Sequence, residues 1–218
     1  MKTKTIAIID YGMGNLKSVE NAFHKVCDYT VTVTDKPQQI LDADMILLPG
    51  VGAFPDAMDQ LHSLDLVPVL NEAVQTLRKP TLGICLGMQL LCEASHEKQW
   101  TNGLGWIPGE VKLIEGGADL RVPHVGWNSL IVTPNDSLFS FLKNDRDYYF
   151  VHSYHVVCHP KFVLAEFEYE KRMVAAIKSD NVIGMQFHPE KSQKTGLQAL
   201  RAFINWADQQ SMNEVLFQ

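Results

Sequence analysis

The chain has 218 residues, of which 46% are hydrophobic and 20% charged, and it carries a formal net charge of −6 at pH 7. That length and hydrophobic fraction suffice for one α/β domain with a sizeable core. The charges are interspersed and no apolar run is long enough to span a bilayer, so the composition predicts neither nucleic-acid binding nor membrane association.

The cysteines and the chain ends bear on location and domain limits. The four cysteines are Cys27, Cys85, Cys92 and Cys158. Their spacing forms neither a Cys-x-x-Cys pair nor a disulfide framework, which favours a reducing, cytoplasmic setting. The first residues lead directly into a strand pattern, so we expect no signal peptide. Residues 214–218 resemble a protease-site tag remnant. We predict one domain over residues 1–210 and a disordered tail over 211–218.

Residues 5–85 alternate between strand and helix patterns. We expect strands over 5–9, 29–34, 45–48 and 81–84, and helices over 16–26, 37–41, 56–61, 66–77 and after Cys85. This order predicts a mostly parallel sheet with helices on both faces and right-handed crossovers. Ligands of such sheets bind beyond the carboxyl ends of the strands.

The turn over residues 10–15 follows the first strand. Its Gly12-x-Gly14 pair is compatible with the start of a dinucleotide-binding fingerprint, but Lys17 occupies the position of the third glycine. A tight strand-to-helix turn that displays Asn15 at the carboxyl end of the strand fits the residues better.

The second half of the chain has a different character. Strand patterns over 109–115, 127–133, 148–154, 163–169, 173–178 and 182–187 follow one another, and a final amphipathic helix is expected over 193–208. Most of these connections are too short for helical crossovers, so antiparallel or mixed pairing is expected. The predicted fold class is therefore α/β, with a mostly parallel central sheet, flanking helices and additional antiparallel strands.

Cys85 lies between a buried strand pattern and a helix pattern, within Gly83-Ile84-Cys85-Leu86-Gly87. This is the nucleophile-elbow pattern with cysteine in place of serine. A cysteine at a helix N-terminus is favoured as the thiolate, and the Leu86 amide would point toward a developing oxyanion. The alternative is a buried structural cysteine after a core strand.

A glycine-rich loop follows the third expected strand, as Pro49-Gly50-Val51-Gly52-Ala53-Phe54. Its glycines allow the backbone to turn an amide toward a neighbouring site, which makes the amide of Val51 or Gly52 a candidate second oxyanion donor. An ordinary glycine-rich loop is the alternative.

His188 and Glu190 are the candidate partners of Cys85. They follow the last expected strand, with Pro189 between them. Glu190 is close enough in sequence to accept a hydrogen bond from the imidazole and fix its tautomer. A solvated surface histidine is the alternative for His188. The order of nucleophile then His-x-Glu differs from the Ser, Asp, His order of α/β-hydrolases and argues against that class.

Three further histidines gather near Cys158 and raise the question of a metal site: His152, His155 and His159. On one strand, His152 and His155 would point to opposite faces. We therefore predict no metal site.

These motifs resemble those of the triad-type, class I glutamine amidotransferases. Residues 83–89 and 187–190 resemble the two signature motifs of that family. Residues 11–19, 49–54, 123–128 and 149–154 resemble, more narrowly, the glutaminase subunits of imidazole glycerol phosphate synthases. The resemblance extends to about residue 208 and implies a glutamine amidotransferase fold with no cofactor.

The resemblance also implies roles for particular residues. It implies a catalytic triad of Cys85, His188 and Glu190, and an oxyanion hole from the amides of Val51 and Leu86. It implies glutamine-binding positions at Gly52, Gln89, Glu97, Ser153 and Tyr154. It implies a partner interface at Asn15, Tyr149 and Lys191, although a core aromatic and a solvated lysine are the alternatives for the last two.

The implied reaction is hydrolysis of glutamine to glutamate and ammonia. The ammonia would pass to a cyclase subunit, a (β/α)8 barrel that forms a heterodimer with this chain and makes imidazole glycerol phosphate and aminoimidazole carboxamide ribotide in histidine biosynthesis. Two alternatives remain at this point. One is an amidotransferase serving anthranilate, aminodeoxychorismate or pyridoxal phosphate synthesis, and the other is a non-catalytic scaffold subunit.

Overall fold

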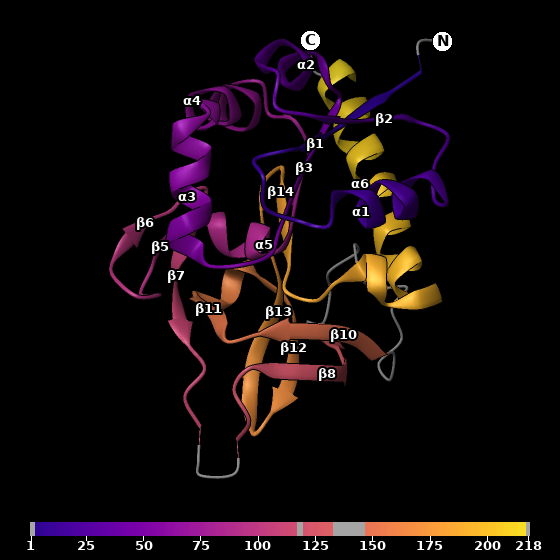
Figure 1. The fold of residues 1–218 in the computed structure, drawn as a ribbon. Helices are drawn as coiled ribbons and strands as arrows, with labels where there is room; N and C mark the ends of the chain where they lie inside the picture. Colours follow the sequence, from indigo (N-terminus) through magenta and orange to yellow (C-terminus); the bar gives the residue numbers. More distant parts are fainter. Residues whose placement is uncertain (1–2, 117–119, 133–146, 217–218) are drawn as a thin grey trace.

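The structure is a computed structural model that describes residues 3–116, 120–132 and 147–216 (Figure 1). Within these ranges an eight-stranded sheet forms the centre of the molecule. In spatial order its strands are β2 (Thr30–Thr34), β1 (Thr5–Ile9), β3 (Met45–Gly50), β4 (Thr81–Cys85), β14 (Val182–Met185), β13 (Lys171–Ser179), β12 (Val163–Tyr169) and β9 (Ile131–Val132). The first five are parallel and the last three continue the sheet in antiparallel fashion.

Two apolar layers cover the faces of this sheet. One layer contains α1 (Leu16–His24) and the long helix α6 (Gln193–Leu216), whose buried side chains include Phe23 and Phe203. The other contains α2 (Pro37–Asp42), α3 (Phe54–Ser63), α4 (Leu66–Asn71) and α5 (Leu86–Leu90). Alternate residues of β1 point into opposite layers, as Ile8 and Ile9 do. A sheet buried on both faces explains the continuous apolar runs of its parallel strands.

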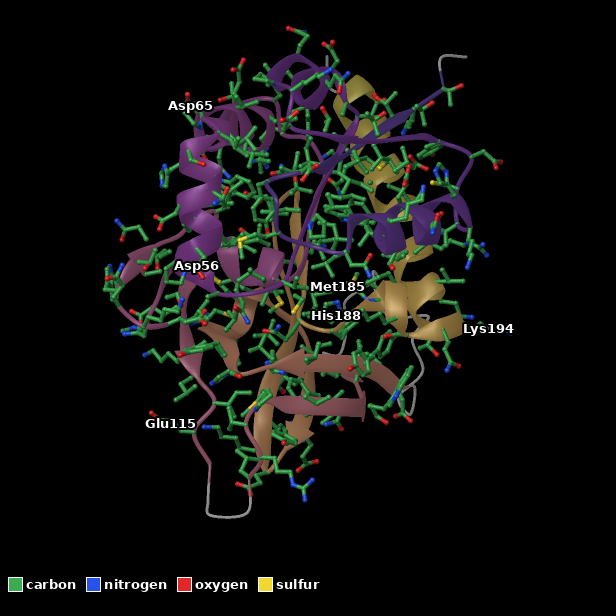
Figure 2. All side chains as sticks on the ribbon, viewed as in Figure 1. Asp56, Asp65, Glu115, Met185, His188 and Lys194 are labelled. Carbon is green, nitrogen blue, oxygen red and sulfur yellow. The ribbon has the colours of Figure 1, made fainter. Side chains whose placement is uncertain are left out.

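Two smaller sheets lie below the carboxyl ends of the parallel strands in Figure 1. One contains β6 (Thr101–Asn102), β5 (Cys92–Ser95), β7 (Ile107–Leu113) and β11 (Tyr154–Cys158), and the other pairs β8 (His124–Ser129) with β10 (Asp147–His152). Because β10 leads into β11 through Ser153, one continuous segment joins the two small sheets. Met185 and His188 lie near the middle of the molecule, whereas Asp56, Asp65, Glu115 and Lys194 lie at its periphery (Figure 2).

The predicted fold class is confirmed, and most predicted elements of the parallel half are found within a few residues of their expected bounds. Among the described residues, no helix is long and apolar enough to cross a membrane. The predicted helix over 66–77 ends as an α-helix at Asn71 and continues as a π-helical turn over Glu72–Thr76.

Two strand predictions in the second half were wrong, and the strands β5 and β6 were not expected. The expected helix after Cys85 is present as α5, which has five residues and is soon followed by β5. Residues 90–92 are apolar and buried on every side, so their pattern has no period that separates a helix from a strand. The strand expected over 148–154 is divided at Ser153 into β10 and β11, and the one expected over 127–133 divides at Leu130, with Thr133 outside the described residues.

The last helix also differs from the prediction, because α6 continues past Asp208 to Leu216. Asp208 fixes this helix to the first strands of the sheet. Its carboxylate accepts one hydrogen bond from Lys4 Nζ and one from the Tyr29 hydroxyl, both at 2.7 Å. The Lys4 and Asp208 side chains are less than one third exposed. This contact connects the amino-terminal and carboxyl-terminal parts of the described chain.

We expect Asp208→Ala to lower the free energy of unfolding by about 1–2 kcal/mol, because both partly buried donors lose a charged acceptor. Urea denaturation monitored by circular dichroism measures this loss. Asp56→Ala is the matched control, since Asp56 pairs with Lys98 on side chains that are both more than half exposed. Its effect should stay within about 0.5 kcal/mol. Equal stability of the two variants would contradict the anchoring role of Asp208.

Candidate active site

Cys85 lies at the junction of β4 and α5, where the backbone turns sharply. Its φ is 55° and its ψ is −110°, a backbone conformation that residues other than glycine seldom adopt. The flanking glycines are required by backbone contacts: a Cβ on Gly87 would lie 1.6 Å from the Leu48 carbonyl oxygen, and one on Gly83 would lie 2.6 Å from the Gly87 oxygen. The crowding that requires these glycines therefore comes from β3 and from the turn itself. The chain thus holds Cys85 in the geometry of a nucleophile elbow.

His188 lies at the same edge of the sheet as Cys85. It follows β14, which pairs in parallel with β4 so that Met185 lies opposite Ile84. Its backbone is fixed by hydrogen bonds from its amide to the Tyr149 carbonyl, at 2.8 Å, and from the Ser192 hydroxyl to its own carbonyl, at 2.6 Å. His188 therefore lies just past the carboxyl end of β14, the strand next to the one that leads into the elbow.

Glu190 orients the imidazole of His188. Glu190 Oε1 lies 2.8 Å from His188 Nδ1, and both side chains are 3% exposed. Burial by itself lowers the pKa of His188, but the Cys85 sulfur and the Glu190 carboxylate outweigh burial and raise the pKa to about 9. The carboxylate accepts from Nδ1, which leaves Nε2 as the atom that exchanges protons with the site.

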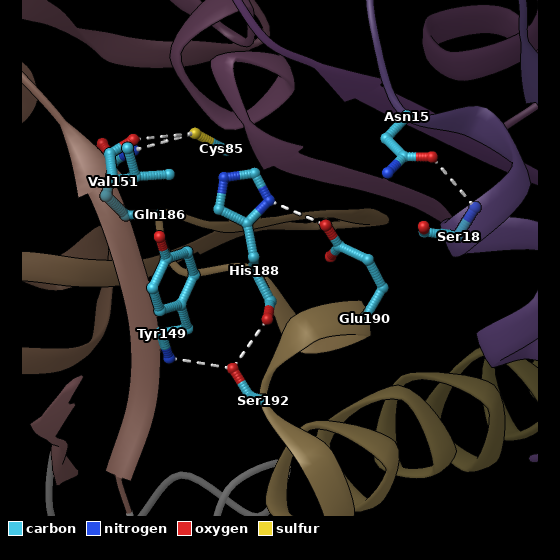
Figure 3. A network of polar contacts seen from close by, with 9 residues as sticks. All are labelled: Asn15, Ser18, Cys85, Tyr149, Val151, Gln186, His188, Glu190 and Ser192. Atoms are coloured by element: carbon cyan, nitrogen blue, oxygen red, sulfur yellow. Dashed lines mark hydrogen bonds and ion pairs between the residues drawn. The ribbon is translucent and has the colours of Figure 1, made fainter. Parts of the chain in front are cut away.

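The Cys85 sulfur has two polar neighbours besides His188 (Figure 3). The Val151 carbonyl oxygen, which accepts from the thiol, and the Gln186 side-chain nitrogen, which donates to the sulfur, each lie 3.8 Å away. Nε2 of His188 is buried and has no hydrogen-bond partner in the part of the chain that the structure describes. The imidazole ring lies beside Cys85 in Figure 3, so Nε2 is the atom that takes the thiol proton, and the raised pKa of His188 favours the resulting thiolate–imidazolium pair.

A cavity of about 350 Å³ opens over Cys85. Cys85 and His188 line it. So does every residue predicted for the oxyanion hole and for glutamine binding, namely Val51, Gly52, Leu86, Gln89, Glu97, Ser153 and Tyr154. Pro123, Val151 and His152 also line it and were not predicted. Glu97 is half-buried and accepts a 2.7 Å hydrogen bond from the Phe54 amide, so it is held at the cavity wall and is not a fully exposed loop carboxylate.

The glycine-rich loop after β3 forms one rim of this cavity. The Tyr11 hydroxyl is buried and donates a 2.8 Å hydrogen bond to the Pro49 carbonyl. A Cβ on Gly50 would lie 2.2 Å from that hydroxyl, so the approach of Tyr11 requires glycine. Gly52 has a φ of 108° and Val51 is 41% exposed. The loop is thus fixed at Pro49 and open to solvent at Val51.

The three predicted interface residues lie on the outer side of the triad. Asn15 is exposed and caps α1 by accepting a hydrogen bond from the Ser18 amide. Lys191 Nζ lies 5.9 Å from the centre of the Tyr149 ring, and a small cleft joins Asn15 and Lys191 to Glu190. Tyr149 is half-buried, whereas its neighbours Tyr148 and Phe150 are fully buried, so Tyr149 is not a core aromatic.

A pair of buried histidines, His124 and His152, lies at the cavity wall, which His152 lines. His152 Nδ1 is 2.8 Å from the Tyr154 carbonyl, which can only accept, and His152 Nε2 is 3.1 Å from His124 Nδ1. His152 therefore donates from Nδ1 to the Tyr154 carbonyl and is neutral, so that its Nε2 accepts from the Nδ1–H of a neutral His124. Burial lowers the pKa of His124 to about 4 and is the main cause that lowers the pKa of His152 to about 3. No local sequence pattern marks this pair, because its members come from two different strands, β8 and β10.

Comparison with known proteins places the chain in a family. Residues 7–206 match the family model described as Glutamine amidotransferase class-I. The chain is 56% identical over 207 residues to the imidazole glycerol phosphate synthase subunit HisH 2 of Vibrio vulnificus, covering 95% of this chain and 97% of that protein. It is 45% identical to subunit HisH of Bacillus cereus, covering 91% of this chain and 93% of that protein.

Solved structures agree on the fold. One described as a glutamine amidotransferase has a TM-score of 0.74 at 15% identity, covering 93% of this chain and 98% of that chain. The structure of PurLQS from Thermotoga maritima has a TM-score of 0.71 at 17% identity, covering 94% and 99%. At such identities the likeness concerns the fold.

The buried histidine pair predicts acid sensitivity. Unfolded histidines titrate near 6.5, so between pH 6.5 and about 4 the unfolded chain binds more protons than the folded chain. Stability contributed by the pair is complete above pH 6.5 and is lost as the pH falls. Two protons correspond to a slope of about 2.7 kcal/mol per pH unit. Urea denaturation at a series of pH values measures how the free energy of unfolding changes with pH. In His124→Asn the slope of this change should be smaller by the contribution of one proton, which is about 1.4 kcal/mol per pH unit.

Replacement of the exposed His62 by Asn controls for the loss of a histidine on the surface. A His124→Asn slope equal to that of the unmodified chain would contradict the assignment of a neutral, buried His124.

Proposed function

The chain belongs to the class-I glutamine amidotransferase family, and on that premise we propose that it is the glutaminase subunit of an imidazole glycerol phosphate synthase. The observation that carries the proposal is the convergence of Cys85, His188 and Glu190 at one edge of the sheet, beneath a cavity lined by Gln89 and Glu97. The names of the relatives in Vibrio vulnificus and Bacillus cereus support the choice of pathway.

In the proposed mechanism, Cys85 attacks the side-chain amide carbon of glutamine. His188 Nε2 takes the thiol proton and returns it to the leaving nitrogen, so that ammonia departs and a glutamyl thioester remains on Cys85. His188 then activates a water molecule that hydrolyses the thioester to glutamate. Glu190 keeps Nδ1 as the donor and stabilises the imidazolium in each half-reaction, a role supported by the 2.8 Å contact between these side chains.

The amides of Val51 and Leu86 are the proposed oxyanion donors, since both residues line the cavity next to Cys85. Gln89 donates both of its side-chain N–H groups, to the Tyr154 carbonyl at 3.0 Å and to Gln186 Oε1 at 3.1 Å. Its own oxygen therefore remains to accept from glutamine. The Glu97 carboxylate and the Ser153 and Tyr154 backbone, with Gly52, complete the proposed binding site.

The proposed partner is a cyclase subunit with a (β/α)8 barrel that receives the ammonia in a cytoplasmic heterodimer. Asn15, Tyr149 and Lys191 are the proposed contacts, because Asn15 and Lys191 line the cleft on the outer side of the triad and the Tyr149 ring lies beside Lys191. Trp127 extends this surface, since the residue is 48% exposed and its ring packs edge-on against the Tyr149 ring, with 5.8 Å between the ring centres. An aromatic side chain exposed at this level is typical of a protein interface.

The test is glutamate release from glutamine by this chain in three states: alone, with a histidine-pathway cyclase subunit, and with that subunit and its ribotide ligand. We expect a low rate alone and a rise of about 10²–10³-fold in the full mixture, which is the effect of one oxyanion donor on kcat. Equal rates in all three states would contradict the proposed partner and favour another amidotransferase pathway.

Cys85→Ala separates an enzyme from a scaffold. The variant should lose glutamine-dependent synthesis, because no thioester can form, and should keep the synthesis that added ammonium salts support through the cyclase. Glutamine turnover by this variant would disprove the assignment of the nucleophile.

Glu190→Gln should retain the fold and reduce glutaminase kcat by about 10³–10⁴-fold, because an amide can hold the wrong imidazole tautomer and carries no charge to balance the imidazolium. Steady-state kinetics in the full complex measure the change, and the unfolding midpoint in urea checks the fold. A rate near that of the unmodified enzyme would remove Glu190 from the mechanism.

A further inference from the structure

Gln186 is a fully buried polar residue between the nucleophile and the glutamine-binding wall. Resting on the function proposed above, we propose that Gln186 is a further catalytic residue, whose side-chain amide donates an N–H to the Cys85 sulfur and favours the thiolate. Cys85 and Gln186 are 101 residues apart in sequence, and the pairing of β4 with β14 brings them together. Figure 3 shows both side chains on the same side of the imidazole.

The orientation of the Gln186 amide follows from a group that can act in only one way. The Tyr154 carbonyl oxygen is an acceptor, so the Gln89 atom 3.0 Å from it is the nitrogen. That same nitrogen lies 3.1 Å from Gln186 and therefore faces its oxygen. The remaining end of the Gln186 amide, which lies 3.8 Å from the Cys85 sulfur, is consequently its NH₂ group.

The position of this NH₂ group is fixed from several directions. The Gln186 backbone amide donates to the Ala175 carbonyl at 2.8 Å, which continues the pairing of β13 with β14. The Tyr154 carbonyl that orders Gln89 also accepts from His152 Nδ1 at 2.8 Å. A series of donors that begins at the cavity wall therefore ends at the nucleophile.

The two polar neighbours of the sulfur respond oppositely to its ionisation. The Val151 carbonyl oxygen, 3.8 Å from the sulfur, accepts from the thiol and repels the thiolate. The Gln186 N–H donor is attracted more strongly by the thiolate than by the thiol. Loss of the donor would leave the sulfur with a neighbour that favours the protonated form and with His188 as the remaining support for the anion.

The proposed role transfers no proton and forms no covalent bond. The thiol proton still moves to His188 Nε2, and the electron pair of the thiolate forms the bond to the amide carbon of glutamine. When the sulfur becomes part of the thioester its charge is gone and the Gln186 contact weakens. The contact returns when water displaces the thiolate. Gln186 thus acts on the two steps in which the sulfur carries charge.

The experiment is the rate of Cys85 alkylation by iodoacetamide as a function of pH, followed by mass spectrometry of the Cys85 peptide. In Gln186→Met, which keeps the length of the side chain and removes the donor, the pH midpoint of alkylation should rise by about one unit. Glutaminase kcat/KM of the full complex should fall by about tenfold near neutral pH. An unchanged alkylation midpoint would overturn the proposal.

Asn181→Leu is the matched control. Asn181 is also a buried amide, and it donates to the Val74 and Lys79 carbonyls at the amino-terminal ends of β4 and β14, the opposite edge of the sheet from Cys85. The control loses buried hydrogen bonds, so it tests whether destabilisation moves the midpoint. A midpoint that moves equally in Asn181→Leu and Gln186→Met would overturn the specific role.

Gln186→Asn serves if the Met variant does not fold. It retains a buried amide but withdraws the donor from the sulfur by one methylene, so its midpoint should also rise. The alkylation readout requires neither glutamine nor a partner. If the midpoint rises in the Gln186 variants but the unmodified chain shows no glutaminase activity in the full complex, the proposed function alone is contradicted. If the unmodified complex is active but the midpoint of the variants is unchanged, the role of Gln186 alone is contradicted.

Discussion

Backbone hydrogen bonds between the parallel strands β4 and β14 place Cys85 and His188 at one edge of the sheet, and the rest of the site is built outward from that pairing. The register sets Gly184 opposite Gly83 and Met185 opposite Ile84. A slip of one residue would turn Gln186 and His188 to the opposite face. The register is held because β14 is fully buried and also pairs with β13 on its other side. The alignment of Cys85 with His188 therefore depends on backbone pairing in the core, and not on side-chain contacts of the site residues.

The segment from Val151 to Tyr154 is the second support of the site. Its carbonyl groups serve the site at both ends, since the Val151 oxygen faces the Cys85 sulfur and the Tyr154 oxygen orders Gln89 and His152. The segment belongs to two sheets, because β10 pairs with β8 and β11 pairs with β7. Tyr149 and Trp127 lie on the same pair of strands, β10 and β8, and form the exposed surface outside the triad. The strand β10 therefore connects the exposed surface at Tyr149 directly to the cavity wall at Val151.

The sequence predicted what contiguous residues dictate. The elbow at Cys85 and the His-x-Glu arrangement each occupy a few neighbouring positions whose spacing has a steric or hydrogen-bonding reason, and both are found as predicted in position. Gln186 and the His124–His152 pair were missed because each acquires its partner from a distant strand. The end of the helix α5 was not predicted for a related reason. Its apolar residues are buried by elements on all sides, and no local period marks where the helix ends.

Unpaired polar atoms within the triad argue for a site that is completed by its ligand. His188 Nε2 and Glu190 Oε2 are both buried, and neither has a hydrogen-bond partner among the described residues. An unpaired buried polar atom costs about 1–3 kcal/mol, so a fold selected for stability alone would pair or replace them. Their neighbours are instead the Cys85 sulfur and the cleft that leads to Asn15 and Lys191. His188 and Glu190 are thus held by their mutual contact at Nδ1 and Oε1, which leaves Nε2 facing the Cys85 sulfur with which it exchanges the proton.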